Sequence, residues 1–181
     1  MKKLIVMGAV SALSLVAVSR APAQVVNNNT TIPIIVVTMF TPSTVSVPVD
    51  PAVATAVVTV ADRIRRDRQV ISPITGVAIP PEIVDVVIAM MSTATPEVRT
   101  QVLNALSQSG ASGAVVRQLM QNLPSLLSNS TPGQQQAALS AFNGLVNNSN
   151  AAFLVNPPAE FLAIHAILLL LTDAANSVPH P

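Results

Sequence analysis

Near its C-terminus the chain reads FLAIHAILLLL (Phe161–Leu171), the most apolar run outside the N-terminal leader, and only His165 interrupts it. Prolines 157 and 158 precede the run, and proline is tolerated in the first turn of a helix. We therefore expect a helix from Pro158 to Ala175. The eleven-residue run would extend about 16 Å as a helix, less than the roughly 30 Å of hydrocarbon in a bilayer. The pattern favours the central helix of a soluble bundle and predicts no transmembrane segment in the mature chain.

Five amphipathic helices are expected before this central helix. Each begins at a short polar residue or a proline, which suit the cap and the first turn, and each carries apolar residues at spacings of three and four. The expected starts are Asp50-Pro51, Pro81-Glu82, Thr95-Pro96, Ser112 and Thr131-Pro132. Thr131 and Gln134 match the capping-box pattern. In the first of these helices, the valine and threonine content of Val57–Val60 makes a strand the alternative.

The sequence therefore predicts an all-α fold. We expect a compact bundle of about five to six helices over residues 50–176, built around the hydrophobic C-terminal helix, with a terminal tail at residues 177–181. Two Thr-Pro pairs, at Thr95 and Thr131, are 36 residues apart, a spacing of the order found in helical solenoids. Because a solenoid needs at least three repeats, we favour a globular bundle.

The first 23 residues have the pattern of a secretory signal peptide. Lys2-Lys3 precede an apolar core from Leu4 to Val18, and Ala21-Pro22-Ala23 provides a small-x-small cleavage site. An uncleaved membrane anchor is the alternative. The chain has no cysteine, so it is not a lipoprotein and has no disulfide. We expect export to a bacterial periplasm or to the cell exterior.

Residues 24–49 are predicted to form an extended arm rich in Pro, Thr and Val. Prolines at 33, 42 and 48 prevent a long helix, and the β-branched residues between them favour one strand near Ile34–Phe40. Such a strand can pair with the edge of a partner's sheet, in which case Ile34, Val36 and Phe40 are the contact residues. The alternative is a strap that lies across the chain's own domain.

Charge and composition exclude several classes of function. Without the leader, six arginines against eight acidic residues give a formal net charge of −2, which predicts no general attraction to nucleic acid. Half of the full chain is hydrophobic and only 9% is charged, so a disordered polyampholyte is excluded. Four phenylalanines and no Trp or Tyr leave few ring faces for sugars or bases.

One charge run stands out in the sequence Asp62-Arg63-Ile64-Arg65-Arg66-Asp67-Arg68. It holds four of the six arginines of the mature chain, namely Arg63, Arg65, Arg66 and Arg68. On a helix, Asp62–Arg66 and Arg63–Asp67 are i,i+4 pairs, so we expect much of this charge to be neutralised locally. A solvated helix end explains the run. A dock for an acidic partner or for anionic lipid headgroups is the functional interpretation, and it makes the run the best candidate for a specific contact.

No catalytic, metal or cofactor site is predicted. His165 is the only histidine before the tail and has no carboxylate or cysteine at zinc-site spacing. We expect it to form the narrow solvent-exposed edge of an otherwise buried helix. A buried polar relay or a pH-sensitive contact is the alternative. Gly110–Ala114 approaches G-x-S-x-G but lacks the last glycine and follows a helix, so a triad of Ser112, His165 and Asp173 is only a remote hypothesis.

These observations favour a non-enzymatic, exported protein of the bacterial envelope that acts through contact with a protein partner or through self-association. The alternative is a carrier of a hydrophobic ligand such as a lipid, because Met90, Met91 and Met120 could line a cavity between apolar helices. A serine hydrolase built on Ser112 is a third and weaker hypothesis.

Overall fold

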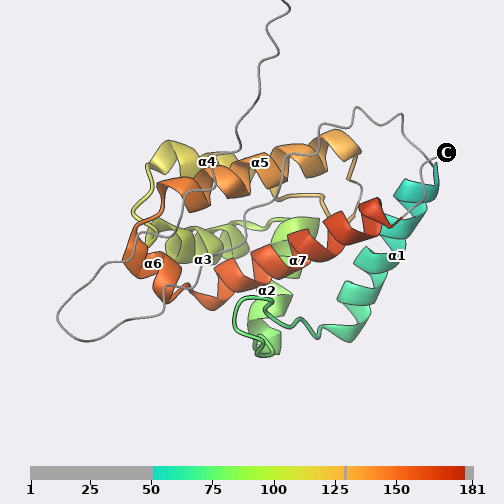
Figure 1. Ribbon diagram of the computed structural model, residues 1–181, viewed down its shortest axis with the longest axis horizontal. Helices are drawn as coiled ribbons and strands as arrows, with labels where there is room; N and C mark the ends of the chain where they lie inside the picture. Colours follow the sequence, from blue (N-terminus) through green and yellow to red (C-terminus); the bar gives the residue numbers. More distant parts are fainter. Residues whose placement is uncertain (1–50, 129, 178–181) are drawn as a thin grey trace, which may run out of the picture. The chain divides into compact units, whose positions relative to one another are not determined.

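The computed structural model describes residues 51–128 and 130–177, which fold into seven helices with no strand (Figure 1). The helices are α1 (Pro51–Asp67), α2 (Pro81–Ser92), α3 (Pro96–Ser107), α4 (Gly113–Asn122), α5 (Pro132–Asn148), α6 (Ala151–Val155) and α7 (Ala159–Asn176). The predicted all-α class is therefore confirmed. The predicted signal peptide (1–23) and arm (24–49), with its strand at Ile34–Phe40, lie outside the described residues.

Helix α7 is the central element, as the apolar run predicts. Helices α1, α2, α3 and α5 all pack against it (Figure 1), and half of its residues are buried. The helix has 18 residues, about 27 Å, so its length and composition alone would suffice to cross a membrane. The eleven-residue apolar run is therefore shorter than the helix that contains it. The burial of α7 among its neighbours is what marks it as a core helix.

The helix starts follow the predicted cap residues. Ser112 accepts a hydrogen bond from the backbone N–H of Val115 at the start of α4. At α5 both bonds of the predicted capping box form: Thr131 Oγ1 accepts from the Gln134 N–H at 3.2 Å, and Gln134 Oε1 accepts from the Thr131 N–H at 2.8 Å. Because these bonds satisfy amides that lack helical partners, they fix where each helix begins.

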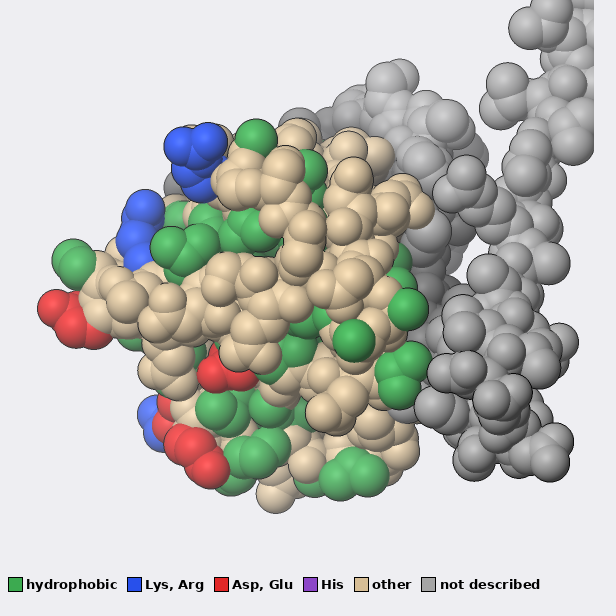
Figure 2. All heavy atoms as spheres, turned by 90° about the vertical axis from the view of Figure 1, so that its left-hand side faces the viewer, with side chains coloured by type: hydrophobic (Ala, Val, Ile, Leu, Met, Phe, Trp, Pro, Cys, Tyr) green, Lys and Arg blue, Asp and Glu red, His purple; other side chains and the backbone are tan. Residues whose placement is uncertain are grey.

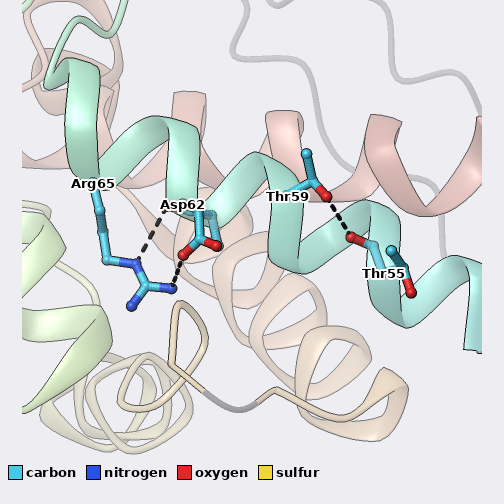
Figure 3. A network of polar contacts seen from close by, with 5 residues as sticks. Thr55, Thr59, Asp62 and Arg65 are labelled. Carbon is cyan, nitrogen blue, oxygen red and sulfur yellow. Dashed lines mark hydrogen bonds and ion pairs between the residues drawn. The ribbon is translucent and has the colours of Figure 1, made fainter.

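The Val/Thr-rich start of the domain is helical and not a strand. The apolar stripe of α1, which includes Val57, Ala61 and Ile64, is buried against the core. The hydroxyl of Thr59 donates to the carbonyl of Thr55 at 2.8 Å, so this side chain is hydrogen-bonded within the helix (Figure 3). Burial of one face thus outweighs the β propensity of the individual residues.

The short helix α6 has no counterpart among the predicted elements. The sequence pattern indicates only a polar turn at residues 147–150, and α5 in fact continues to Asn148. Asn150 then caps α6 by accepting from the Phe153 N–H at 2.8 Å. Five residues are too few to show a helical period. Phe153 is nonetheless buried, and its ring meets Phe161 of α7 edge-on at 5.0 Å.

Candidate functional site

The predicted arginine run lies at the C-terminal end of α1. Arg63, Arg66 and Arg68 are exposed, and Arg65 is half-buried. Arg65 Nη2 forms an ion pair with Asp62 Oδ1 at 2.8 Å, one turn back on the same helix (Figure 3). Arg68 is bound to a second element instead, because its Nη1 lies 3.2 Å from Asp85 Oδ2 of α2.

The predicted i,i+4 pairs do not form. Within residues 51–128 and 130–177, the ion pairs are Asp62–Arg65 and Arg68–Asp85, and neither joins Asp62 to Arg66 or Arg63 to Asp67. The i,i+3 partner takes the Asp62 carboxylate in place of the i,i+4 partner. In this part of the chain, the guanidinium groups of Arg63 and Arg66 therefore remain exposed and outside any ion pair.

A groove runs beside these arginines. It encloses about 500 Å³, is open to solvent, and lies between α1, the α1–α2 connection and α7. Its lining consists of Arg63, Asp67, Gln69, Val70, Ile71, Pro73, Ala166, Leu169 and Leu170. The α7 side is aliphatic, whereas the α1 side carries one cation and one carboxylate. We call this feature the α1–α7 groove.

The α1–α7 groove brings together residues that are about 100 positions apart in the sequence. Arg63 is a predicted contact residue, whereas Leu169 and Leu170 are recognisable from the sequence only as members of the central apolar run. Both leucines are half-buried, so they present part of their aliphatic surface to the groove. The sequence signal for this surface is that the run is apolar on nearly every side of its helix. Neighbouring helices cover one stripe of such a helix, and apolar side chains outside that stripe stay open. Which side of α7 stays open depends on the packing of α1.

His165 is buried, whereas the sequence predicts that it lies on a narrow solvent-exposed edge of the helix. Only 1% of its surface is exposed, and its ring stacks on Phe142 of α5 with centroids 5.5 Å apart. Phe142 also stacks on Phe161 at 5.0 Å. The expectation was wrong because Phe142 covers this side of α7. His165 belongs to an aromatic cluster with Phe142, Phe153 and Phe161 that joins α5, α6 and α7.

The residues of the hypothetical triad lie in different surroundings. Ser112 is exposed at the start of α4, where its hydroxyl accepts the cap bond, and α4 packs mainly against α3 and α5. His165 is in the core, and Asp173 is exposed about two turns further along α7. Ser112 and Asp173 at the surface and His165 in the core therefore do not share the common setting that a nucleophile, its base and an orienting carboxylate need.

The described residues also gather no metal-binding group of three or more His, Asp or Glu side chains. The three methionines that could have lined a ligand cavity are core residues: Met90, Met91 and Met120 are all buried and none lines the α1–α7 groove. Figure 2 shows a face of the molecule on which hydrophobic side chains, other uncharged side chains and backbone cover most of the surface. The arginine cluster at the end of α1 holds four of the six arginines in the described residues.

The fold and this surface define an all-α bundle with a basic helix end beside an open apolar groove. Comparison of the chain with known protein families, with curated proteins and with solved structures finds no match in any of the three.

Proposed function

We propose that this chain is an exported, non-enzymatic protein of the bacterial envelope that acts through protein–protein contact or self-association. Export is supported by the leader pattern of residues 1–23, with its basic start, apolar core and Ala21-Pro22-Ala23 site. The contact is supported above all by one observation: Arg63 stands exposed, outside the ion pairs of the described residues, at the edge of an apolar groove.

Such a combination suits recognition of another protein. Arginine is enriched at interfaces, where its long, planar cation can bind a carboxylate while neighbouring aliphatic surface is removed from water. Arg63 supplies the charge, and Leu169 and Leu170 supply the aliphatic surface. A partner that fits would place an acidic side chain near Arg63 and Arg66 and an aliphatic one in the groove.

The arm is the second contact element of this proposal. Ile34, Val36 and Phe40 lie outside the described residues, so their role rests on the sequence alone. Addition of an extended segment to the edge of a partner's sheet supplies backbone hydrogen bonds along its whole length. Together, an arm and a basic groove would make two separate contacts, which raises the affinity through effective concentration.

Deletion of residues 25–49 tests the proposal. We expect the deletion to abolish self-association or partner association, measured by light scattering and native mass spectrometry, while the helical circular dichroism persists. Arg63→Glu should weaken the same association because it reverses the charge at the groove. The matched control is Arg117→Glu, which reverses an exposed arginine on α4, away from the groove. Association unchanged by both the deletion and Arg63→Glu would rule out the proposal.

The carrier of a hydrophobic ligand remains the alternative. It is favoured by the aliphatic α7 side of the groove, which could hold one acyl chain. The groove is open, however, and a bound chain would keep much of its surface in water. Organic extraction of the purified protein distinguishes the two functions, since stoichiometric lipid supports a carrier and lipid-free protein supports protein contact.

A further inference from the structure

The connection between α1 and α2 contains a small hairpin, residues 70–79. The Ser72 N–H donates to the Val77 carbonyl and the Ile79 N–H donates to the Val70 carbonyl, both at 2.9 Å, on either side of a bridge between Ile71 and Ala78. Its turn is closed by the Gly76 N–H, which donates to the Ser72 carbonyl at 2.8 Å. These bonds hold the hairpin in one conformation.

The hairpin has both buried and exposed side chains. Val70, Ser72 and Ile79 face inwards and are at most 5% exposed. Ile71 and Val77 are each 64% exposed, which makes them the most exposed of the four large hydrophobic residues that stand out on the described surface; the other two are Val58 and Leu103. Single exposed aliphatic residues are ordinary, but this hairpin carries two, one on each side of its turn, and we call Ile71 and Val77 the apolar tip.

Two arginines lie near Ile71. Ile71 and Arg63 line the same α1–α7 groove, and Arg68 lies two residues before the hairpin with 60% of its side chain exposed. Nearby carboxylates offset part of the charge: Asp62 and Asp85 each hold one arginine in an ion pair, and Asp67 lines the groove. Among the arginines at this end of α1, Arg63 and Arg66 are exposed and in no ion pair; elsewhere in the described part of the chain the same holds for Arg99 and Arg117.

We propose that this hairpin and the end of α1 bind the surface of an anionic lipid bilayer. Ile71 and Val77 enter the boundary between headgroups and acyl chains, while Arg63 and Arg66 contact lipid phosphates with their aliphatic stems directed inwards. A bilayer suits the site because its charge complements the free arginines and it requires only a small apolar anchor.

Flotation of the full chain with vesicles tests this inference. The probes are vesicles of phosphatidylcholine alone and vesicles of equal parts phosphatidylcholine and phosphatidylglycerol. We expect tighter binding to the anionic vesicles at low salt, with the difference lost at high salt because screening weakens surface attraction. Arg63→Gln combined with Arg66→Gln should lower that binding about fivefold per arginine, from roughly 1 kcal/mol for each cation at such a surface.

Matched controls separate this site from the rest of the chain. Arg99→Gln with Arg117→Gln removes the same charge elsewhere, and Leu103→Ser with Val58→Ser removes the same kind of exposed side chain. Both control pairs should bind the anionic vesicles nearly as the parent does, whereas Ile71→Ser with Val77→Ser should lose most binding. Circular dichroism verifies that each variant is folded.

The bilayer contact shares Arg63 and Arg66 with the proposed protein contact, and deletion of the arm separates the two. Deletion of residues 25–49 should leave the difference between anionic and neutral vesicles unchanged, even where it abolishes protein association. Equal binding to both kinds of vesicle, no binding, or equal losses from hairpin and control pairs would overturn the bilayer contact. A hairpin variant that loses protein association instead would assign the apolar tip to a protein partner, which also overturns it.

Discussion

At the scale of single residues, Gly110 joins two parts of the fold. It has a φ of 74°, and a Cβ built on it would lie 2.6 Å from Asn150 Nδ2. Asn150 has little freedom to move, because its side chain caps α6 and its N–H donates to the Ser109 carbonyl at 2.8 Å. Glycine is thus required here both by the backbone conformation and by the available space.

We therefore expect Gly110→Ala to destabilise the protein by about 1–3 kcal/mol, from left-handed strain and displacement of the Asn150 cap. Gly144→Ala is the matched control, because Gly144 lies inside α5 and its added Cβ would meet nothing within 4 Å. That substitution should stabilise by about 0.5–1 kcal/mol through helix propensity. Urea unfolding measures both, and two changes of the same sign would contradict the distinct roles assigned to these glycines.

Most core residues are predictable from their spacing, and the exceptions have physical causes. The predicted stripe of α4, which includes Val116, Leu119 and Met120, is buried throughout. The spacing predicts a stripe of Val84, Val87, Ile88 and Met91 for α2, yet Met90 is buried as well. Helix α2 packs against both α3 and α7, so its buried face is wider than a single stripe. The burial of His165 depends on Phe142, 23 residues away in sequence, and spacing along one helix carries no such information.

At the scale of elements, two helices start with the same Thr-Pro pair but are capped differently. Thr131 accepts a hydrogen bond from the Gln134 N–H, and the capping box is complete. Thr95 occupies the same position before α3, yet its side chain makes no cap hydrogen bond. The second bond of a capping box comes from the third residue of the helix. In α5 that residue is Gln134, whose side-chain oxygen accepts from the backbone N–H of Thr131.

This difference predicts unequal costs for one substitution. Thr131→Ala should cost about 1 kcal/mol of unfolding free energy, because it leaves a helix N–H without its acceptor. Thr95→Ala removes no such bond and should stay within about 0.5 kcal/mol of the parent. Thermal and urea unfolding under identical conditions provide the comparison. Equal losses at the two positions would show that the capping bond at α5 contributes nothing measurable.

Helix starts are the features best predicted from sequence, because caps and prolines act locally. The starts of α2, α3, α4 and α5 agree with the predicted residues. Helix α6 escapes prediction because one turn has no period to detect, and it is held by the Asn150 cap and by Phe153 against Phe161. The valine-rich α1 is ambiguous from sequence because its local propensity opposes the burial that decides its structure.

At the scale of the whole molecule, the bundle around α7 is predictable and its surface only in part. An apolar helix must be covered, so the sequence requires amphipathic neighbours. The arginine run is recognisable as a charge cluster, but one of its two ion pairs depends on Asp85, which belongs to another helix. The α1–α7 groove could not be foreseen, since its position depends on how α1 crosses α7.

Native mass spectrometry of the protein recovered from a bacterial periplasm tests the proposed export and contact most directly, because it reports cleavage and association together. We predict a chain that begins at Gln24 and is found as a complex with a second copy or with a protein partner. A bound lipid of defined mass would favour the carrier instead. A bare monomer that retains residues 1–23 would contradict both the proposed export and the proposed contact.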